Sequence, residues 1–290
     1  MATGRGGRLP ISIVHACLRD GRGGSPTAVV DDAEGALSDA ERCRVPARCG
    51  TSHAVFVTPS APDDVVRLRF FTAEAELPAC GHGTVAALAV LAARHAGAEG
   101  EFRLRASGRA FTGRTLRRGD RVQAAFDPGP VILREPTPAE FGLVSAALGV
   151  TPDLLGPGVR VASLGRPRLL VPVATAEAVA ALAPDQDRLR AACEQAGLLG
   201  CYVHSMPTGG GRLVARMFAP AIGVPEDIAN ANSTACLAAH LADRGFPELR
   251  VDMGDALGVP ATITTATQRT ASGPRILVGG AATIGHTGVQ

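Results

Sequence analysis

The sequence contains no lysine: all 29 basic residues of the 290-residue chain are arginine. Without lysine the protein can form neither a Schiff base with pyridoxal phosphate nor the phosphate contact of a P-loop. Tryptophan is absent and there is one tyrosine, so we expect no aromatic surface for stacking nucleic-acid bases. Asp and Glu number 27, which leaves a formal charge of +2 and no strong field for a polyanion.

Long hydrophobic runs and paired cysteines are also missing. The longest apolar run, Val85–Ala93, is about half the roughly 18 residues that a membrane-spanning helix needs. We interpret residues 1–8 as a frayed start; the apolar stretch Ile11–Leu18 contains His15 and leads to no cleavage site, so no signal peptide is predicted. Seven cysteines without a CxxC pair argue against a disulfide framework and favour a reducing, cytoplasmic location.

An internal repeat is the most informative feature of the sequence. Arg69-Phe70-Phe71-Thr72 aligns with Arg216-Met217-Phe218-Ala219 at an offset of 147 residues (216 − 69). The segments 54–57 and 201–204, and Pro78 and Pro225, share this offset. After the prolines the offset grows to 150 residues, which aligns Thr84 with Thr234. Since 46% of the residues are hydrophobic and the length suits two medium domains, the repeat predicts two globular halves of one design.

Each half is predicted to contain several strands and a helix that follows a proline-marked turn. Alternating β-branched runs predict strands at Ile11–Cys17, Thr27–Asp31, His53–Thr58, Val65–Phe71, Phe102–Ala106, Val122–Phe126, Arg160–Leu164, Arg168–Val173, Gly200–Ser205, Arg212–Phe218, Leu249–Met253 and Ile276–Val278. Amphipathic helices are predicted at Ala139–Leu148 and Gln186–Ala196. The Pro- and Gly-rich segment 128–138 is predicted to link domains at 8–127 and 139–290, with the last strands able to return to the first half.

Two further helices, Thr84–Ala93 and Thr234–Ala242, are apolar almost all round. A helix without a polar face must be buried on every side. We therefore predict an α+β fold of two pseudo-symmetric domains, each a curled mixed β-sheet around a buried central helix.

Small polar residues begin both central helices: Cys80-Gly81-His82-Gly83-Thr84 and Asn230-Ala231-Asn232-Ser233-Thr234. A helix start carries unpaired N–H groups and a partial positive charge, so it suits an anion. Ordinary N-capping by these residues explains the same pattern without a ligand. Because the pattern occurs at both repeat positions, we predict that Gly81, His82, Gly83, Asn232 and Ser233 bind a small carboxylate substrate.

Two titratable residues near these segments are candidates for chemistry. His53 begins a strand and has the pKa range of a proton shuttle at neutral pH. Its repeat partner is Gly200 (53 + 147), so only the first half has a base there. Asp227 lies just before the second helix start.

Other chemistry at these positions stays open. Cys49, His53, Cys80 and His82 are zinc-ligand types, but their spacing matches no common zinc motif and no metal is predicted. Gly81-x-Gly83 lacks the remaining features of a dinucleotide fingerprint. A Cys80 thiolate acting as a nucleophile with a histidine base is a further alternative.

Four segments, in order, make the chain resemble the PhzF-like (phenazine biosynthesis isomerase) family, which shares its fold with diaminopimelate epimerase. Gly23-Gly24-Ser25-Pro26-Thr27-Ala28-Val29-Val30 resembles the family's G-N-P-x-A-V strand entry, and Ser52-His53-Ala54-Val55-Phe56-Val57 resembles S-E-T-x-F-V. The segment 70–84, with Glu76-Leu77-Pro78-Ala79-Cys80-Gly81-His82, resembles the specific hallmark F-F-T-P-x-x-E-L-P-x-C-G-H-x-T. Phe218-Ala219-Pro220 with Pro225-Glu226-Asp227 resembles F-A-P-x-x-G-x-x-E-D-P-x-T-G-S.

The resemblance implies an isomerase without cofactor or metal, whose site lies between two domains. In the family a Glu of S-E-T shuttles a proton, the G-H backbone holds the substrate carboxylate, and Asp of E-D-P and Ser of T-G-S assist. Gly81, His82 and Asp227 match this pattern, whereas His53 replaces the Glu and Asn232 replaces the Ser.

We expect an isomerase that moves a proton and a double bond in a small unsaturated acid of secondary metabolism, with His53 and Asp227 as catalytic residues. By analogy with a branch of the family in antibiotic biosynthesis, the acid is a cyclic imine of the alkylproline type. Two alternatives are a two-base racemase or epimerase using Cys80 and Asp227, and a non-catalytic binder of small acids. No nucleic-acid or membrane partner is expected, and the sequence leaves a homodimer open.

Overall fold

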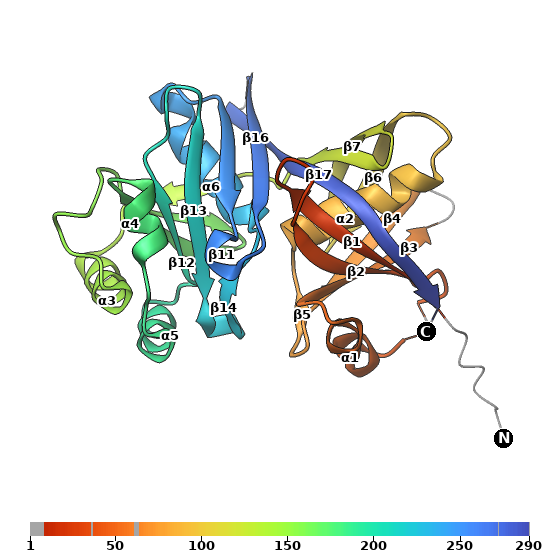
Figure 1. The fold of residues 1–290 in the computed structure, drawn as a ribbon, viewed down its shortest axis with the longest axis horizontal. Helices are drawn as coiled ribbons and strands as arrows, with labels where there is room; N and C mark the ends of the chain where they lie inside the picture. The colour runs from red at the N-terminus through yellow and green to blue at the C-terminus, as the bar shows by residue number, and fades with distance from the viewer. Residues whose placement is uncertain (1–8, 36, 61–63, 272, 290) are drawn as a thin grey trace. The chain divides into compact units, whose positions relative to one another are not determined.

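The computed structural model describes residues 9–35, 37–60, 64–271 and 273–289 (Figure 1). The frayed start predicted at residues 1–8 lies outside this described part. Up to residue 126 the elements are β1 (Pro10–Leu18), β2 (Ser25–Asp31), α1 (Asp39–Cys49), β3 (His53–Ser60), β4 (Val65–Phe71), β5 (Glu76–Leu77), α2 (Gly81–Arg94), β6 (Glu99–Ala106), β7 (Arg109–Arg118) and β8 (Arg121–Phe126).

The later elements are β9 (Ile132–Arg134), α3 (Pro138–Leu148), β10 (Arg160–Leu164), β11 (Arg166–Val173), α4 (Ala176–Ala181), α5 (Gln186–Gln195), β12 (Cys201–Ser205), β13 (Arg212–Ala219), β14 (Val224–Asp227), α6 (Ala231–Leu241), β15 (Glu248–Met253), β16 (Ala261–Thr270) and β17 (Gly273–Val289). Short 3₁₀ turns lie at 220–222, 242–244 and 255–257. All twelve predicted strands and all four predicted helices fall on these elements. Among the described residues, no helix combines the length and the apolar character needed to cross a membrane.

The chain divides into two compact units that interleave along the sequence. The first comprises Met1–Ala16, Pro26–Ala124 and Ala281–Gln290, and the second comprises Cys17–Ser25 and Ala125–Gly280. Strands β1 and β17 therefore each contribute residues to both units. Segment 128–138, predicted to be a linker, contains β9, whose residues pair with β10. The predicted domain limits at 8–127 and 139–290 stay a prediction.

The first unit is a mixed sheet around α2. Strand β3 runs parallel to β2 and antiparallel to β4, and β4 runs parallel to β6. In this register Ala54 lies opposite Phe71, and Val65 lies opposite Arg103. Figure 1 shows α2 surrounded by the strands of this unit.

The second unit repeats this register. Strand β12 runs parallel to β11 and antiparallel to β13, and β13 runs parallel to β15. Cys201 lies opposite Phe218 and Arg212 opposite Arg250. Each of these four residues follows its counterpart by 147 positions (201 − 54, 218 − 71, 212 − 65, 250 − 103). The internal repeat predicted from the sequence is confirmed in the strand pairing.

A repeated ion pair accompanies the repeated strands. Arg69 Nη2 lies 2.6 Å from Glu76 Oε2, and Arg216 Nη2 lies 2.7 Å from Glu226 Oε2. Both arginines belong to the matched strands β4 and β13. The duplication thus includes polar side-chain contacts as well as the apolar pattern.

Both central helices are buried, as their composition predicts. Every residue of α2 from Gly81 to Val90 is buried, and so are nine of the eleven residues of α6. A side chain at Gly113 of β7 would place its Cβ 2.5 Å from the Leu88 side chain of α2. Glycine therefore allows β7 to approach the helix closely. The α+β prediction, with a curled sheet around one helix in each half, is confirmed.

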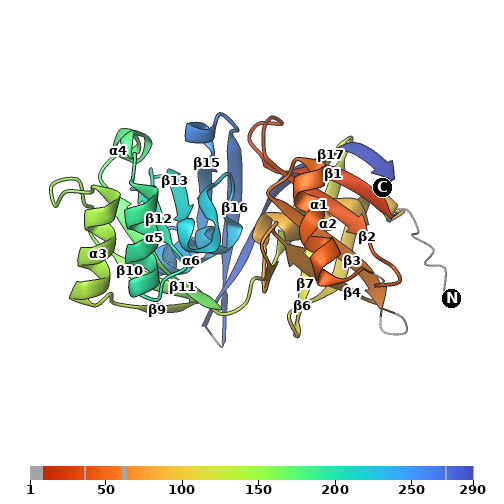
Figure 2. The same cartoon turned by 90° about the horizontal axis from the view of Figure 1, so that it is seen from below.

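Helix α1 was not predicted from the sequence. Its apolar face is short, and Pro46 lies inside it. Ser38 caps it, since its side chain accepts a hydrogen bond from the Glu41 N–H and the Glu41 carboxylate accepts one in return from the Ser38 N–H. Arg42 pairs with the buried Asp32 at 2.7 Å. In Figure 2, α1 lies beside the sheet of the first unit, where Val45 packs into its core.

Candidate active site

His53 lies at the start of β3, on the face of the sheet that carries α2. Side chains alternate along a strand, and the neighbouring Ala54 belongs to the core cluster beneath α1. The His53 side chain is therefore directed to the opposite, α2-bearing face. His53 is 4% exposed, and its Nδ1 lies 2.8 Å from Ser52 Oγ. The Ser52 contact therefore engages Nδ1 of the two ring nitrogens.

The start of α2 lacks a capping side chain. Cys80 is the N-cap residue, with extended backbone, and its side chain makes no hydrogen bond to the first helical turn. The Cys80 carbonyl accepts hydrogen bonds from the N–H and from Oγ1 of Thr84, both at 2.8–2.9 Å. A Cβ at Gly83 would lie 3.0 Å from Cys80 Sγ and from the Phe70 ring. The motif therefore combines a helix start without a side-chain cap and a glycine, Gly83, that allows close packing against the sulfur.

Three predicted residues meet at this helix start. The rings of His53 and His82 pack edge to face with 4.5 Å between centroids, and Cys80 Sγ lies 3.4 Å from His82 Nε2. One ligand atom from each of His53, Cys80 and His82 lies within 4.8 Å of the others, and all three residues are buried. Among the described residues, Cys49 is not part of this group. A base, a thiol and a second imidazole therefore share one buried position beside a helix start.

Burial controls the protonation of His53. Burial, together with a smaller contribution from charge on the neighbouring His82, lowers the pKa of this imidazole to about 3. The sequence led us to expect a pKa near 6.5, and this expectation is wrong because it ignored the loss of water around the ring. At neutral pH His53 is uncharged, so it can accept a proton without first losing one.

The start of α6 is built differently, because Asn230 caps it. Its Oδ1 accepts a hydrogen bond from the Ser233 N–H at 2.9 Å, and its Nδ2 donates to Asp227 Oδ2 at 2.9 Å. Asp227 is 8% exposed and Ser233 is fully buried, whereas Asn232 is half-buried. Ser233 Oγ contacts Met217 Sδ and the buried Arg168, each at 3.4 Å. The sequence analysis included Asn230 in this helix start but did not select it as a site residue, although its position three residues before Ser233 is typical of an N-cap.

The structure thus gathers His53, Cys80, Gly81, His82 and Gly83 in the first unit. In the second unit, Asp227 and Ser233 are joined through the two ends of one asparagine side chain. The N-caps also define the repeat: Thr84 bonds the Cys80 carbonyl as Thr234 bonds that of Asn230. Cys80 therefore corresponds to Asn230.

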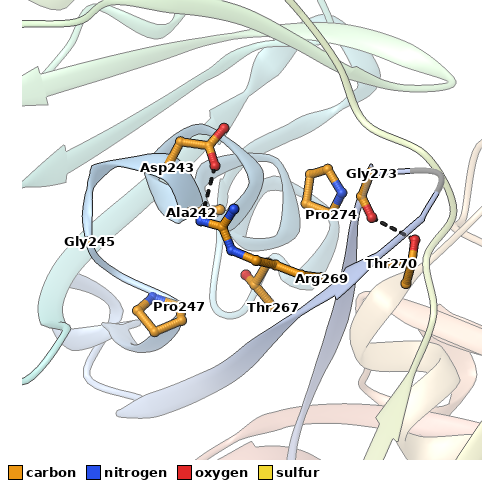
Figure 3. Close-up of a pocket in the computed structure, with 9 residues that line it drawn as sticks. All are labelled: Ala242, Asp243, Gly245, Pro247, Thr267, Arg269, Thr270, Gly273 and Pro274. Atoms are coloured by element: carbon orange, nitrogen blue, oxygen red, sulfur yellow. Dashed lines mark hydrogen bonds and ion pairs between the residues drawn. The ribbon is translucent and has the colours of Figure 1, made fainter.

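A surface hollow of about 540 Å³ in the second unit contains none of the predicted site residues. Figure 3 shows Arg269 and Asp243 facing each other there. Arg269 Nη2 lies 3.6 Å from Asp243 Oδ1. Both side chains are more than 80% exposed. Such an exposed pair contributes about 0–1 kcal/mol and defines no chemistry, so we do not assign a site to this hollow.

The fold and site define a class of protein: a diaminopimelate epimerase-like fold with buried acid–base groups at a central helix start. The solved structures of a probable proline racemase from Agrobacterium radiobacter and a hydroxyproline epimerase from Agrobacterium vitis resemble the chain in fold, with TM-scores of 0.63 and 0.64 at 11% and 10% identity. The model of the phenazine biosynthesis-like protein family matches residues 15–288. The chain belongs to this family, and the family predicted from the sequence motifs is confirmed.

Relatives in this family are named isomerases. An uncharacterized isomerase of Deinococcus radiodurans is 31% identical, with the alignment covering 92% of this chain and 89% of the relative. The trans-2,3-dihydro-3-hydroxyanthranilate isomerase of Pseudomonas aeruginosa is 32% identical, covering 86% and 87%. A solved predicted epimerase from Pseudomonas aeruginosa superimposes with a TM-score of 0.82 at 26% identity, covering 98% and 99%. The protein is therefore an isomerase of this family.

Proposed function

We propose that this isomerase moves a proton, and with it a double bond, within a small unsaturated carboxylic acid, using His53 as the proton shuttle and no cofactor. The supporting observation is the neutral, buried imidazole of His53 beside the α2 start, which has no side-chain cap. The acid we favour is a cyclic imine of the alkylproline type. Its place in secondary metabolism and a cytoplasmic location are part of the same proposal.

The first step is binding of the substrate carboxylate at the α2 start. The backbone N–H groups of the first turn and the positive end of the helix dipole favour an anion there. A carboxylate within about 4–6 Å of an imidazole raises its pKa by roughly 1–3 units. Bound substrate would thus partly reverse the effect of burial on His53. The base becomes stronger when its substrate arrives.

His53 then both removes the proton and returns it, so one residue carries out the whole transfer. Nε2 of His53 removes a proton from one carbon, so a C–H bond breaks while an N–H bond forms. The electron pair moves along the conjugated acid, and the N–H proton passes to the acceptor carbon as the double bond shifts. His53 returns to its neutral form. The helix start stabilises the enolate-like charge between the two transfers.

Residues of the second unit complete the proposal. We assign Asp227 to assist catalysis by binding a substrate nitrogen, and Asn232 and Ser233 to bind substrate. Ser233 Oγ contacts Met217 and Arg168, and the Ser233 N–H donates to Asn230 Oδ1, so a substrate contact at Ser233 would replace one of these partners. These assignments stay predictions.

Deuterium exchange tests the shuttle. The probes are trans-2,3-dihydro-3-hydroxyanthranilate and a cyclic imine acid with an exocyclic double bond, each incubated in D₂O and followed by NMR. We expect deuterium at the acceptor carbon and a 10²–10⁴-fold slower exchange in His53→Gln. His53→Glu should retain exchange with a shifted pH profile. His95→Gln, at the exposed end of α2, is the matched control. Unchanged exchange in His53→Gln would remove His53 from the mechanism.

The contact between Cys80 Sγ and His82 Nε2 favours one alternative, a racemase in which Cys80 is a base. Its partner base would be Asp227. Such an enzyme exchanges the proton at one chiral carbon without moving a double bond. Cys80→Ser should then abolish exchange, while His53→Gln should not. A protein that only binds small acids would be stabilised by the probe and show no exchange in any variant.

A further inference from the structure

Two imidazoles and one thiol form a single buried cluster in the first unit, and we propose that this cluster binds a thiophilic divalent cation such as Zn²⁺. The ligands are His53, Cys80 and His82, whose ligand atoms lie within 4.8 Å of one another. None of the three residues is more than 6% exposed. The cation is a competitor for the site rather than a resident cofactor of the isomerase.

The spacing of the ligand atoms suits a tetrahedral ion. Zinc binds sulfur at about 2.3 Å and imidazole nitrogen at about 2.0 Å, which separates S and N by roughly 3.5 Å in a tetrahedral site. Cys80 Sγ and His82 Nε2 already lie 3.4 Å apart. The ligand atom of His53 lies within 4.8 Å of both others, so it must approach them by at most roughly 1.5 Å to reach tetrahedral spacing.

Ser52 supplies the outer contact that a ligating histidine needs. A metal-bound histidine almost always uses its second ring nitrogen in a hydrogen bond that fixes the ring. Ser52 Oγ lies 2.8 Å from Nδ1 of His53, so Nδ1–H can donate to it and Nε2 can face the cation. Nitrogen and sulfur ligands favour Zn²⁺ over Mg²⁺ or Ca²⁺, which prefer oxygen.

Three protein ligands leave one position of the cation open. Water or a carboxylate oxygen can take it, as in catalytic rather than structural zinc sites. Binding converts the Cys80 thiol to a thiolate and releases its proton to solvent, so affinity falls as the pH is lowered. With its nitrogen on the metal, His53 cannot carry a proton. The inference that the cation competes with proton transfer rests on the proposed function, whereas the inference that the cation binds does not.

Cobalt provides the direct test, because Co²⁺ is coloured and occupies zinc sites. We expect the full-length protein, with no substrate present, to take up one equivalent of Co²⁺. The bound ion should show thiolate-to-cobalt absorption in the near ultraviolet and the visible bands of a tetrahedral site, and Zn²⁺ should displace it. Absence of one-to-one binding at millimolar Co²⁺ would overturn the proposal.

Variants assign the ligands. Cys80→Ser should abolish the near-ultraviolet band, and His82→Gln should weaken binding at least tenfold. The double variant Cys43→Ser/Cys49→Ser removes two half-buried thiols of α1 and should bind as the parent does. A band that survives in Cys80→Ser, or is lost in the double variant, would contradict the assignment.

X-ray absorption of the zinc-loaded parent protein needs no variant and decides the matter if Cys80→Ser fails to fold. One sulfur neighbour with two imidazoles supports the cluster, and a shell without sulfur refutes it. Because no substrate is used, failure of metal binding leaves the isomerase proposal intact. The deuterium-exchange result for His53→Gln, in turn, has no bearing on whether the parent protein binds the cation.

Discussion

The helix starts of α2 and α6 occupy the same place in a duplicated scaffold, yet only one is capped. At both, a threonine in the first turn bonds the N-cap carbonyl. In the second unit Asn230 satisfies the Ser233 N–H from within the chain, whereas Cys80 offers no such bond. An N-cap of this kind contributes about 1 kcal/mol. The difference teaches that the two copies of the scaffold begin the same helix with and without a side-chain cap.

The strand beside each helix start shows the same divergence. His53 begins β3 with a side chain that fits under α2. Its counterpart, Gly200, precedes β12, where a Cβ would lie 2.1 Å from the carbonyl oxygen of Phe218. The second copy therefore has no room for a base at this position. At this strand edge the first unit carries a titratable side chain, and the second has no space for one.

Placing a side chain at position 200 of the second unit should have the largest effect on stability. Gly200→Ala pushes its Cβ against backbone, which cannot rotate away, so we expect a loss of about 2–4 kcal/mol in the free energy of unfolding. Urea denaturation followed by circular dichroism measures it. Gly142→Ala is the matched control: it adds the same methyl inside α3, where nothing lies within 4 Å. That variant should gain about 0.5–1 kcal/mol. Equal stability of the two variants would refute the argument from close approach.

Acidification should separate the buried histidines from the exposed ones. Burial lowers the pKa of His53 to about 3 and that of His204 to about 4. An unfolded histidine titrates near pH 6.5, so between these values the unfolded state binds more protons than the folded state. Stability must fall as the pH drops from about 6.5, by up to about 1.4 kcal/mol per pH unit for each group.

Denaturation curves at pH 7 and pH 5 check this sign. His53→Gln and His204→Gln should each reduce the stability difference between the two pH values, because glutamine takes up no proton. His95→Gln removes an exposed histidine and should leave the difference unchanged. A parent protein that is equally stable at both pH values would show that these rings are solvated.

The cap itself should have the smallest effect. Asn230→Ala removes both the bond from the Ser233 N–H and the bond to Asp227, so we expect a loss of about 1 kcal/mol. Asn230→Asp should keep the first bond but place two carboxylates side by side. Thermal unfolding measures both variants against the parent. If Asn230→Ala is as stable as the parent, the capped start offers no advantage over the start at Cys80.

Much of the architecture could be predicted because it depends on local patterns. Strands such as Val65–Phe71 carry alternating β-branched residues, and the uniform apolar character of α2 required burial. Helix α1 escaped prediction because it buries little apolar surface and is held by Arg42 and a capping box. The family motifs identified His53, Cys80, His82 and Asp227 as candidates, since these positions are defined by residue type and spacing.

The amino-acid order alone therefore determined the duplication, the two buried helices and the family of this protein. Only the tertiary structure decided that His53, Cys80 and His82 form one cluster, because they approach one another across a strand and a helix. It also decided that burial, rather than residue type, sets the pKa of His53, and that Asn230 joins Asp227 to a helix start. Protonation and side-chain contact depend on which groups exclude water from which others, and that is a property of packing in three dimensions.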